Sequence, residues 1–241
     1  RDFCLSRGLG DVYKRQGLYM DRTFLILIPA ILLSIYASFK VSSTTKKYFK
    51  VRAMKGMTGQ EVARRILDSN GLSSVPVNPV PGSLTDHYDP RGKTVSLSEE
   101  VFYGTSITSI SVAAHECGHA IQDKESYVPM MFRSAIVPAV NFASSASWII
   151  IMMGFFVSRQ FLWLGIVLFS ATVLFQVVTL PVEFNASSRA LKQLESLGIV
   201  GLDEHKESKK VLNAAALTYV AAALASILQL VRLVLLARND D

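Results

Sequence analysis

The sequence predicts a mainly α-helical membrane protein, with about four transmembrane helices and a small α+β unit at the cytoplasmic face. Half of its 241 residues are hydrophobic, only 18% are charged, and the mean hydropathy is +0.33. A soluble domain carries about 25% charged residues. The hydrophobic residues are gathered into runs close to the roughly 20 residues that cross a bilayer. High hydrophobicity excludes a disordered chain, and two cysteines exclude a disulfide-rich scaffold.

Residues 20–40 are predicted to form an N-terminal membrane anchor. The run 24–39 contains no charge, and Thr23 and Lys40 can extend it to about 20 residues. A cleavable signal peptide is the alternative, but the basic residues follow the run and no A-x-A site closes it. Residues 1–19 are expected to be a non-native leader, because the segment 11–16 resembles a translated sequencing adaptor.

Residues 41–133 have the pattern of a small α+β unit. A capping box at 58–61 predicts a helix start, and the Asn-Gly pair at 70–71 predicts its end. Prolines in the segment 76–90 favour an extended chain. The alternating residues 94–97 then predict a short strand.

Two apolar runs, 138–157 and 161–181, are joined only by residues 158–160 and predict a transmembrane hairpin within 134–181. Residues 182–210 are expected to be a polar segment and cytoplasmic loop. Residues 211–241 predict a fourth membrane helix. Because polar side chains interrupt this last run, a buried or interfacial helix is the alternative.

The distribution of basic residues predicts both the orientation and the partners of the chain. Six bases and no acid lie within residues 40–55, directly after the first apolar run. Several Lys and Arg occur in each of the loops 40–133 and 182–210, whereas 158–160 contains one, so both larger loops are expected in the cytoplasm. The net charge is +6, but the basic residues are not arranged in a recognisable nucleic-acid-binding motif. We therefore expect the lipid bilayer as a partner and no nucleic acid.

The chemistry is concentrated at His115-Glu116-Cys117-Gly118-His119. On a helix, His115 and His119 lie on one face a turn apart, so both imidazoles can reach a single metal ion. Glu116 is about 100° around the helix from His115, where it can accept a proton from a metal-bound water. Cys117 points away from the histidines and is expected only to pack. The alternative is a solvated helix with coincident histidines.

A catalytic zinc ion generally has three protein ligands and a water, so a third ligand is needed. Asp123 and Glu125 lie on the same helix as the histidines and cannot easily turn back to their metal. Glu183 ends the second run of the hairpin, where a carboxylate is costly unless it is paired or metal-bound. Two spans separate Glu183 from His119, so the chain returns to the side that it left. His115, His119 and Glu183 can therefore meet at the cytoplasmic membrane surface.

Four segments make the sequence recognisable: GMTGQEVARR at 56–65, LTDHYDP at 84–90, AAHECGHAIQ at 113–122 and LPVEFNAS at 180–187. On these residues the chain resembles the bacterial neutral zinc metallopeptidases, a family of integral membrane proteins. More distantly, it resembles the membrane gluzincins of the heat-shock and prenyl-protease type, whose third ligand lies in an E-x-x-A-D segment. Here that segment begins at Glu183 and has Ser187 in place of the aspartate. The resemblance supports Glu183 as a ligand. It puts in doubt a supporting acid at position 187, where this sequence has a serine.

The resemblance implies a multi-pass endopeptidase of the bacterial cell membrane, with one Zn²⁺ ion and an active site that faces the cytoplasm. Its substrate would be a peptide or protein, including membrane proteins, whose extended backbone could pair with the strand at 94–97. Four further residues are candidates for stabilising the transition state or orienting a ligand: Asn185, Arg189, His205 and Tyr219. For His205 a solvated loop position is the plainer interpretation, and for Arg189 it is a cation at the membrane surface. His87 is expected to be a hydrogen-bonded loop histidine.

Two other functions fit parts of the sequence. A non-catalytic zinc-binding scaffold or transporter component would not need Glu116, and its structural zinc would require a fourth protein ligand. An intramembrane protease would place the two histidines inside an apolar span, whereas the polar residues 122–125 follow them immediately.

Overall fold

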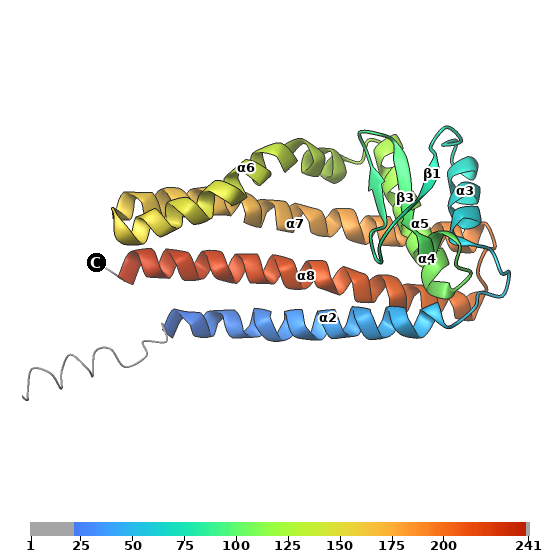
Figure 1. Ribbon diagram of the computed structural model, residues 1–241, viewed down its shortest axis with the longest axis horizontal. Helices are drawn as coiled ribbons and strands as arrows, with labels where there is room; N and C mark the ends of the chain where they lie inside the picture. The colour runs from blue at the N-terminus through green and yellow to red at the C-terminus, as the bar shows by residue number, and fades with distance from the viewer. Residues whose placement is uncertain (1–21, 240–241) are drawn as a thin grey trace, which may run out of the picture.

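The computed structural model describes residues 22–239, in which long helices lie side by side with a compact unit at one end (Figure 1). The expected leader, residues 1–19, lies outside the described residues. The elements in chain order are η1 (Arg22–Leu27), α2 (Ile28–Phe49), α3 (Gly59–Ser69), β1 (Val77–Val80), β2 (His87–Asp89), β3 (Thr94–Ser98), α4 (Glu99–Phe102), α5 (Ile107–Lys124), α6 (Val128–Phe156), α7 (Arg159–Ser196) and α8 (Leu202–Asn239).

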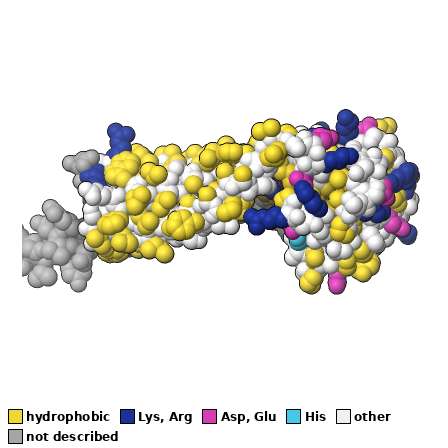
Figure 2. All heavy atoms as spheres, turned by 90° about the horizontal axis from the view of Figure 1, so that it is seen from above, with side chains coloured by type: hydrophobic (Ala, Val, Ile, Leu, Met, Phe, Trp, Pro, Cys, Tyr) yellow, Lys and Arg dark blue, Asp and Glu magenta, His cyan; other side chains and the backbone are white. Residues whose placement is uncertain are grey.

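Within residues 22–239, four helical segments are long and apolar enough to cross a membrane, as the sequence predicts. They are Thr23–Phe49, Val128–Phe156, Arg159–Ser196 and Leu202–Arg238. In the bundle, α6 packs on α7, α7 on α8, and α8 on α2. Many large apolar side chains of these helices stay exposed, among them Phe39, Phe142 and Phe156. Figure 2 shows this apolar surface along the rod, with charged side chains gathered toward its two ends. Such a surface fits contact with lipid.

The segment 182–210, expected to contain a loop, is helical except for residues 197–201. The physical reason is an apolar stripe that continues at every fourth residue of α7, through Val182, Ala186, Ala190 and Leu194, all fully buried. With 38 residues, α7 is about 57 Å long, nearly twice the roughly 30 Å of a bilayer core. Its C-terminal part is therefore outside the apolar layer and belongs to the compact unit.

The compact unit contains α3, α4, α5 and a three-stranded sheet. Thr58 and Glu61 form the predicted capping box at the start of α3: the Glu61 N–H donates to Thr58 Oγ1 and the Thr58 N–H donates to Glu61 Oε2. Gly71 follows the helix with a φ of +66°, which suits glycine. Side chains from α3, β3 and α5 share one buried core with the C-terminal part of α7.

The sheet has the order β1-β3-β2, with β1 parallel and β2 antiparallel to β3. The predicted strand at 94–97 is therefore β3, but it is the central strand. Its two edges are paired with β1 and β2, so neither edge is free to bind a substrate backbone. The expected pairing of this strand with a substrate is therefore wrong. Both β2 and β3 contact α5, and of these two β2 is the edge strand.

Helices α5 and α7 approach each other closely at Gly118. A Cβ atom added to Gly118 would lie 2.6 Å from the Ala186 carbonyl oxygen and 3.2 Å from the Ala186 Cα. These are backbone atoms of a buried helix and cannot rotate away. Gly118 therefore sets the distance between the helix that carries the two histidines and the helix that carries Glu183.

We expect Gly118→Ala to destabilise the protein by about 1–3 kcal/mol, the usual cost of overpacking a core. The measurement is thermal unfolding of the purified protein in detergent. Gly201→Ala is the matched control, because a Cβ atom at Gly201 meets nothing within 4 Å. Equal unfolding temperatures for the two variants would contradict the close contact.

Candidate metal centre

Helix α5 carries the candidate metal-binding histidines and is fixed at its start by Ser106. The Ser106 hydroxyl accepts a hydrogen bond from the Ser109 N–H, which satisfies one of the free donors of the first turn. The helix then runs through the core with almost every residue buried, including Glu116 and His119. This burial excludes the alternative of a solvated helix with coincident histidines.

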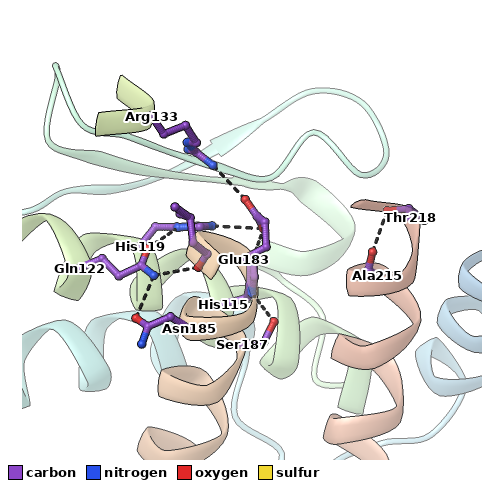
Figure 3. Close-up of polar contacts among 10 residues, drawn as sticks. His115, His119, Gln122, Arg133, Glu183, Asn185, Ser187, Ala215 and Thr218 are labelled. Atoms are coloured by element: carbon purple, nitrogen blue, oxygen red, sulfur yellow. Dashed lines mark hydrogen bonds and ion pairs between the residues drawn. The ribbon is translucent and has the colours of Figure 1, made fainter. Parts of the chain in front are cut away.

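The two histidines face Glu183 of α7, as the sequence predicts. Glu183 Oε2 lies 3.2 Å from His115 Nε2 and 3.6 Å from His119 Nε2. Each of the three residues thus offers one potential ligand atom, and these three atoms lie within 4.8 Å of one another. Figure 3 shows the carboxylate of Glu183 directed at the imidazoles. The turn between α6 and α7 is what returns Glu183 to α5.

Gln122 fixes the proton position on His119. Its amide nitrogen donates to the Val182 carbonyl (2.8 Å) and to Asn185 Oδ1 (2.9 Å), so its amide oxygen must face His119 Nδ1, 2.9 Å away. That oxygen can only accept a hydrogen bond, so Nδ1 carries the proton. The neutral ring then presents the lone pair of Nε2 toward Glu183, as a metal ligand requires.

Ser187 contacts the ring of His115 at its other nitrogen. Its hydroxyl lies 3.2 Å from His115 Nδ1, on the side of the ring opposite to Glu183 (Figure 3). The related gluzincin segment has an aspartate at this position. A serine hydroxyl can accept a hydrogen bond from Nδ1–H, so the substitution keeps the hydrogen-bonded position and removes the negative charge.

Arg133 contacts the second oxygen of Glu183 and is absent from the residues expected from the sequence. Its Nη1 donates to Glu183 Oε1 at 3.0 Å, while Oε2 faces the histidines. Glu183 itself is only 3% exposed. A sequence signal did exist: Arg133 is the only charged residue between Glu125 and Arg159. A lone cation beside an apolar span needs a partner, and here that partner is a buried carboxylate.

Glu116 lies next to the ligand set and lines the same cavity. Burial raises the pKa of its carboxyl from 4.5 to about 7, an increase that His115 opposes and Glu183 reinforces. A carboxyl group with a pKa near neutrality can both accept and return a proton at physiological pH.

The cavity has a volume of about 570 Å³ and lies between the compact unit and the membrane helices α6, α7 and α8. From the compact unit it is lined by Asp86, His87, Tyr88, His115, Glu116 and His119, and from the helices by Arg133, Val137, Phe175, Gln176, Thr179, Glu183, Thr218, Tyr219 and Ala222. Both walls are therefore polar and charged, and Val137, Phe175 and Ala222 add apolar surface on the side of the bundle.

Of the four other candidate residues, only Tyr219 lines this cavity. Asn185 lies beside Gln122, behind the histidines (Figure 3), and its Oδ1 also accepts a hydrogen bond from Arg189 Nε. Arg189 also pairs with Glu125 at 2.7 Å. His205 lies 3.7 Å from Glu195 and away from the cavity.

His87 and Cys117 lie outside the candidate metal cluster, as expected, but His87 is on strand β2 and not in a loop. His87 lines the cavity from β2, with its Nδ1 2.8 Å from the Thr85 carbonyl oxygen, but it is outside the candidate metal cluster. Cys117 is buried with its thiol directed at the Ala63 carbonyl, and burial raises the pKa of that thiol. It faces away from the ligands and packs in the core.

The comparisons with known proteins agree with this geometry. The family described as "Putative neutral zinc metallopeptidase" matches residues 23–238. The chain belongs to this family. It is also 54% identical over 215 residues to the "Putative membrane protease YugP" of Bacillus subtilis (strain 168), covering 89% of this chain and 96% of that protein. No solved structure matches the chain. The family implies a zinc ion, and the cluster of two imidazoles and one carboxylate could hold it, because zinc prefers such groups.

We expect Gln122→Met to weaken zinc binding by about 10- to 100-fold, because it removes the acceptor that fixes the His119 ring. The measurement is zinc affinity of the purified protein in competition with a chelator. Gln193→Met is the matched control, since the Gln193 side chain hydrogen-bonds Asn70, away from the site. An unchanged affinity for Gln122→Met would show that the hydrogen bond does not hold the ring.

Proposed function

We propose that this protein is a membrane-bound zinc endopeptidase, with His115, His119 and Glu183 as the ligands of one zinc ion and Glu116 as the general base. The observation that carries the proposal is the buried cluster of two imidazoles and one carboxylate, which opens beside Glu116 into a cavity. Membership of a zinc metallopeptidase family makes peptide hydrolysis the chemistry to expect there.

The ligand set fits a catalytic zinc ion better than a structural one. A structural zinc is closed by four protein ligands, whereas a catalytic zinc keeps one position open. Among residues 22–239, no fourth His, Cys, Asp or Glu joins the cluster. This is why we favour a peptidase over a non-catalytic zinc-binding scaffold or transporter component.

Zinc, when bound, supplies a Lewis acid that polarises the scissile carbonyl and lowers the pKa of a bound water to about 7. Glu116 then accepts the proton of the attacking water and passes it to the amine that leaves. Arg133 holds Glu183 by its outer oxygen, so that the other oxygen faces the ligand position. Tyr219 is our candidate for stabilising the oxyanion, because it brings a hydroxyl group to the cavity wall from α8.

The substrate that we propose is an extended peptide, including segments of membrane proteins next to the bilayer. Strand β2 is an edge strand, and two of its residues, His87 and Tyr88, line the cavity. Backbone pairing along such an edge accepts peptides of varied sequence. On the side of the bundle, Val137, Phe175 and Ala222 add apolar surface to the cavity, which suits a substrate that reaches the site along the membrane.

We further propose that the compact unit and the site face the cytoplasm of a bacterial cell. The support is the cluster of six bases and no acid in residues 40–55, at the end of α2 that joins the compact unit. Basic residues that flank membrane helices favour the cytoplasmic side.

We expect Glu116→Gln to abolish proteolysis while zinc stays bound, because the amide keeps the shape of the side chain and cannot accept the proton. The measurements are cleavage of an unfolded protein such as casein and the zinc content of the same preparation. Glu195→Gln, an exposed acid on α7, is the control and should keep both. Undiminished cleavage by Glu116→Gln would overturn the proposed mechanism.

We expect Glu183→Ala to lower zinc occupancy sharply, because it removes the third ligand and leaves Arg133 as an uncompensated charge in the site. Zinc content after dialysis against a chelator, with thermal unfolding as a check of folding, measures this effect. Glu195→Ala changes a glutamate of the same helix and should leave occupancy intact. Full occupancy in Glu183→Ala would mean that another residue supplies the third ligand.

A further inference from the structure

A second polar cavity lies between α2 and α8, on the side of α8 that faces away from the candidate metal centre. Its volume is about 680 Å³. Helix α2 contributes Lys40, Ser43, Thr44, Lys47 and Tyr48, and helix α8 contributes Lys210, Asn213, Ala214 and Leu217. On each helix the lining residues recur at intervals of three or four positions, which places them on one face of that helix. The cavity is thus formed by two facing helical stripes.

The charge of this cavity is positive and is not neutralised by neighbouring acids. Lys40, Lys47 and Lys210 line it, and no carboxylate does. Among the described residues, none of these three lysines forms an ion pair. Tyr48 and Asn213 add a hydroxyl and an amide group to the same wall, whereas the Ser43 hydroxyl donates to the Lys40 carbonyl. Three ammonium groups with hydrogen-bond donors around them form a site for a multiply hydrogen-bonding anion such as phosphate.

The position of the cavity along the helices indicates where that anion would come from. Lys40 is the first charge after the apolar run 24–39, and Lys210 is the last before the apolar run that starts at 211. Each lysine marks where the apolar part of its own helix ends, and because α2 and α8 run in opposite directions the cavity extends between these two levels. This is the region of the lipid headgroups. Next to Lys40 on the apolar side, Tyr36 and Phe39 are 54% and 71% exposed, so α2 offers a surface for acyl chains.

We propose that the α2–α8 cavity is a binding site for the phosphate group of an anionic phospholipid, held by Lys40, Lys47 and Lys210. The headgroup enters between the two helices and the acyl chains lie along the apolar part of α2. Free phosphate carries the same chemistry, so the test includes it as a separate probe. The site is separate from the candidate metal centre, because α8 turns Thr218, Tyr219 and Ala222 to that cavity and Asn213, Ala214 and Leu217 to this one.

The test compares two triple variants of the full chain in detergent. One removes the cavity lysines: Lys40→Gln, Lys47→Gln and Lys210→Gln. The matched control removes three lysines outside the cavity, at the same ends of the same helices: Lys46→Gln, Lys50→Gln and Lys209→Gln. Both variants lose the same net charge, and all six side chains are exposed, so folding should be unaffected. Native mass spectrometry then measures binding of phosphatidylglycerol, of phosphatidylcholine and of inorganic phosphate.

We expect the wild type and the control to prefer phosphatidylglycerol over phosphatidylcholine, and the cavity variant to lose that affinity by roughly 100-fold, the scale expected for three lysines near an anionic headgroup. Binding of inorganic phosphate alone, lost in the cavity variant without any preference for phosphatidylglycerol, would assign the same site to free phosphate. Equal losses in the two variants, or no loss in the cavity variant, would overturn the proposal.

Discussion

The arrangement of the whole molecule depends on the burial of one carboxylate, that of Glu183. Its two oxygens point in different directions, one toward His115 and His119 and the other toward Arg133. A carboxylate that is 3% exposed is stable only with such partners. The partners come from α5 and α6, so the hairpin of α6 and α7 must return to the compact unit for the site to exist.

The positions of the site residues are maintained by groups behind them. Gln122 reaches the backbone of α7 and Asn185 while it holds the ring of His119, so the two helices and the ring are fixed by one side chain. Ser187 contacts the ring of His115 from the α7 side. Gly118 lets the helices come close enough for these contacts. The geometry of the cluster therefore belongs to the α5–α7 contact as a whole.

The parts of this structure that follow from local spacing could be predicted from the sequence, and the parts that depend on contacts between distant segments could not. Four-residue spacing placed both histidines on one face, and counting spans brought Glu183 to them. The contact of Arg133 with Glu183 could not be predicted, because it depends on the angle at which α6 leaves the compact unit. No local sequence pattern gives that angle. Strand 94–97 was predicted, but its central place in the sheet depends on which strands pair with it. The helical continuation of 182–210 was missed because its narrow apolar stripe is set among polar and charged residues, which give the segment as a whole the composition of a loop.

The length of α7 has a mechanical consequence. Glu183 lies about 36 Å along a single helix from the hairpin turn at Arg159. If this part of α7 tilted by about 10° around its end at Arg159, and no contact opposed the tilt, the Glu183 carboxylate would move by about 6 Å. Helix tilt responds to the thickness of the bilayer. The contacts of α7 with α5 and α8 thus oppose this tilt. They keep the distances between Glu183 and the two histidines constant when the surrounding bilayer changes.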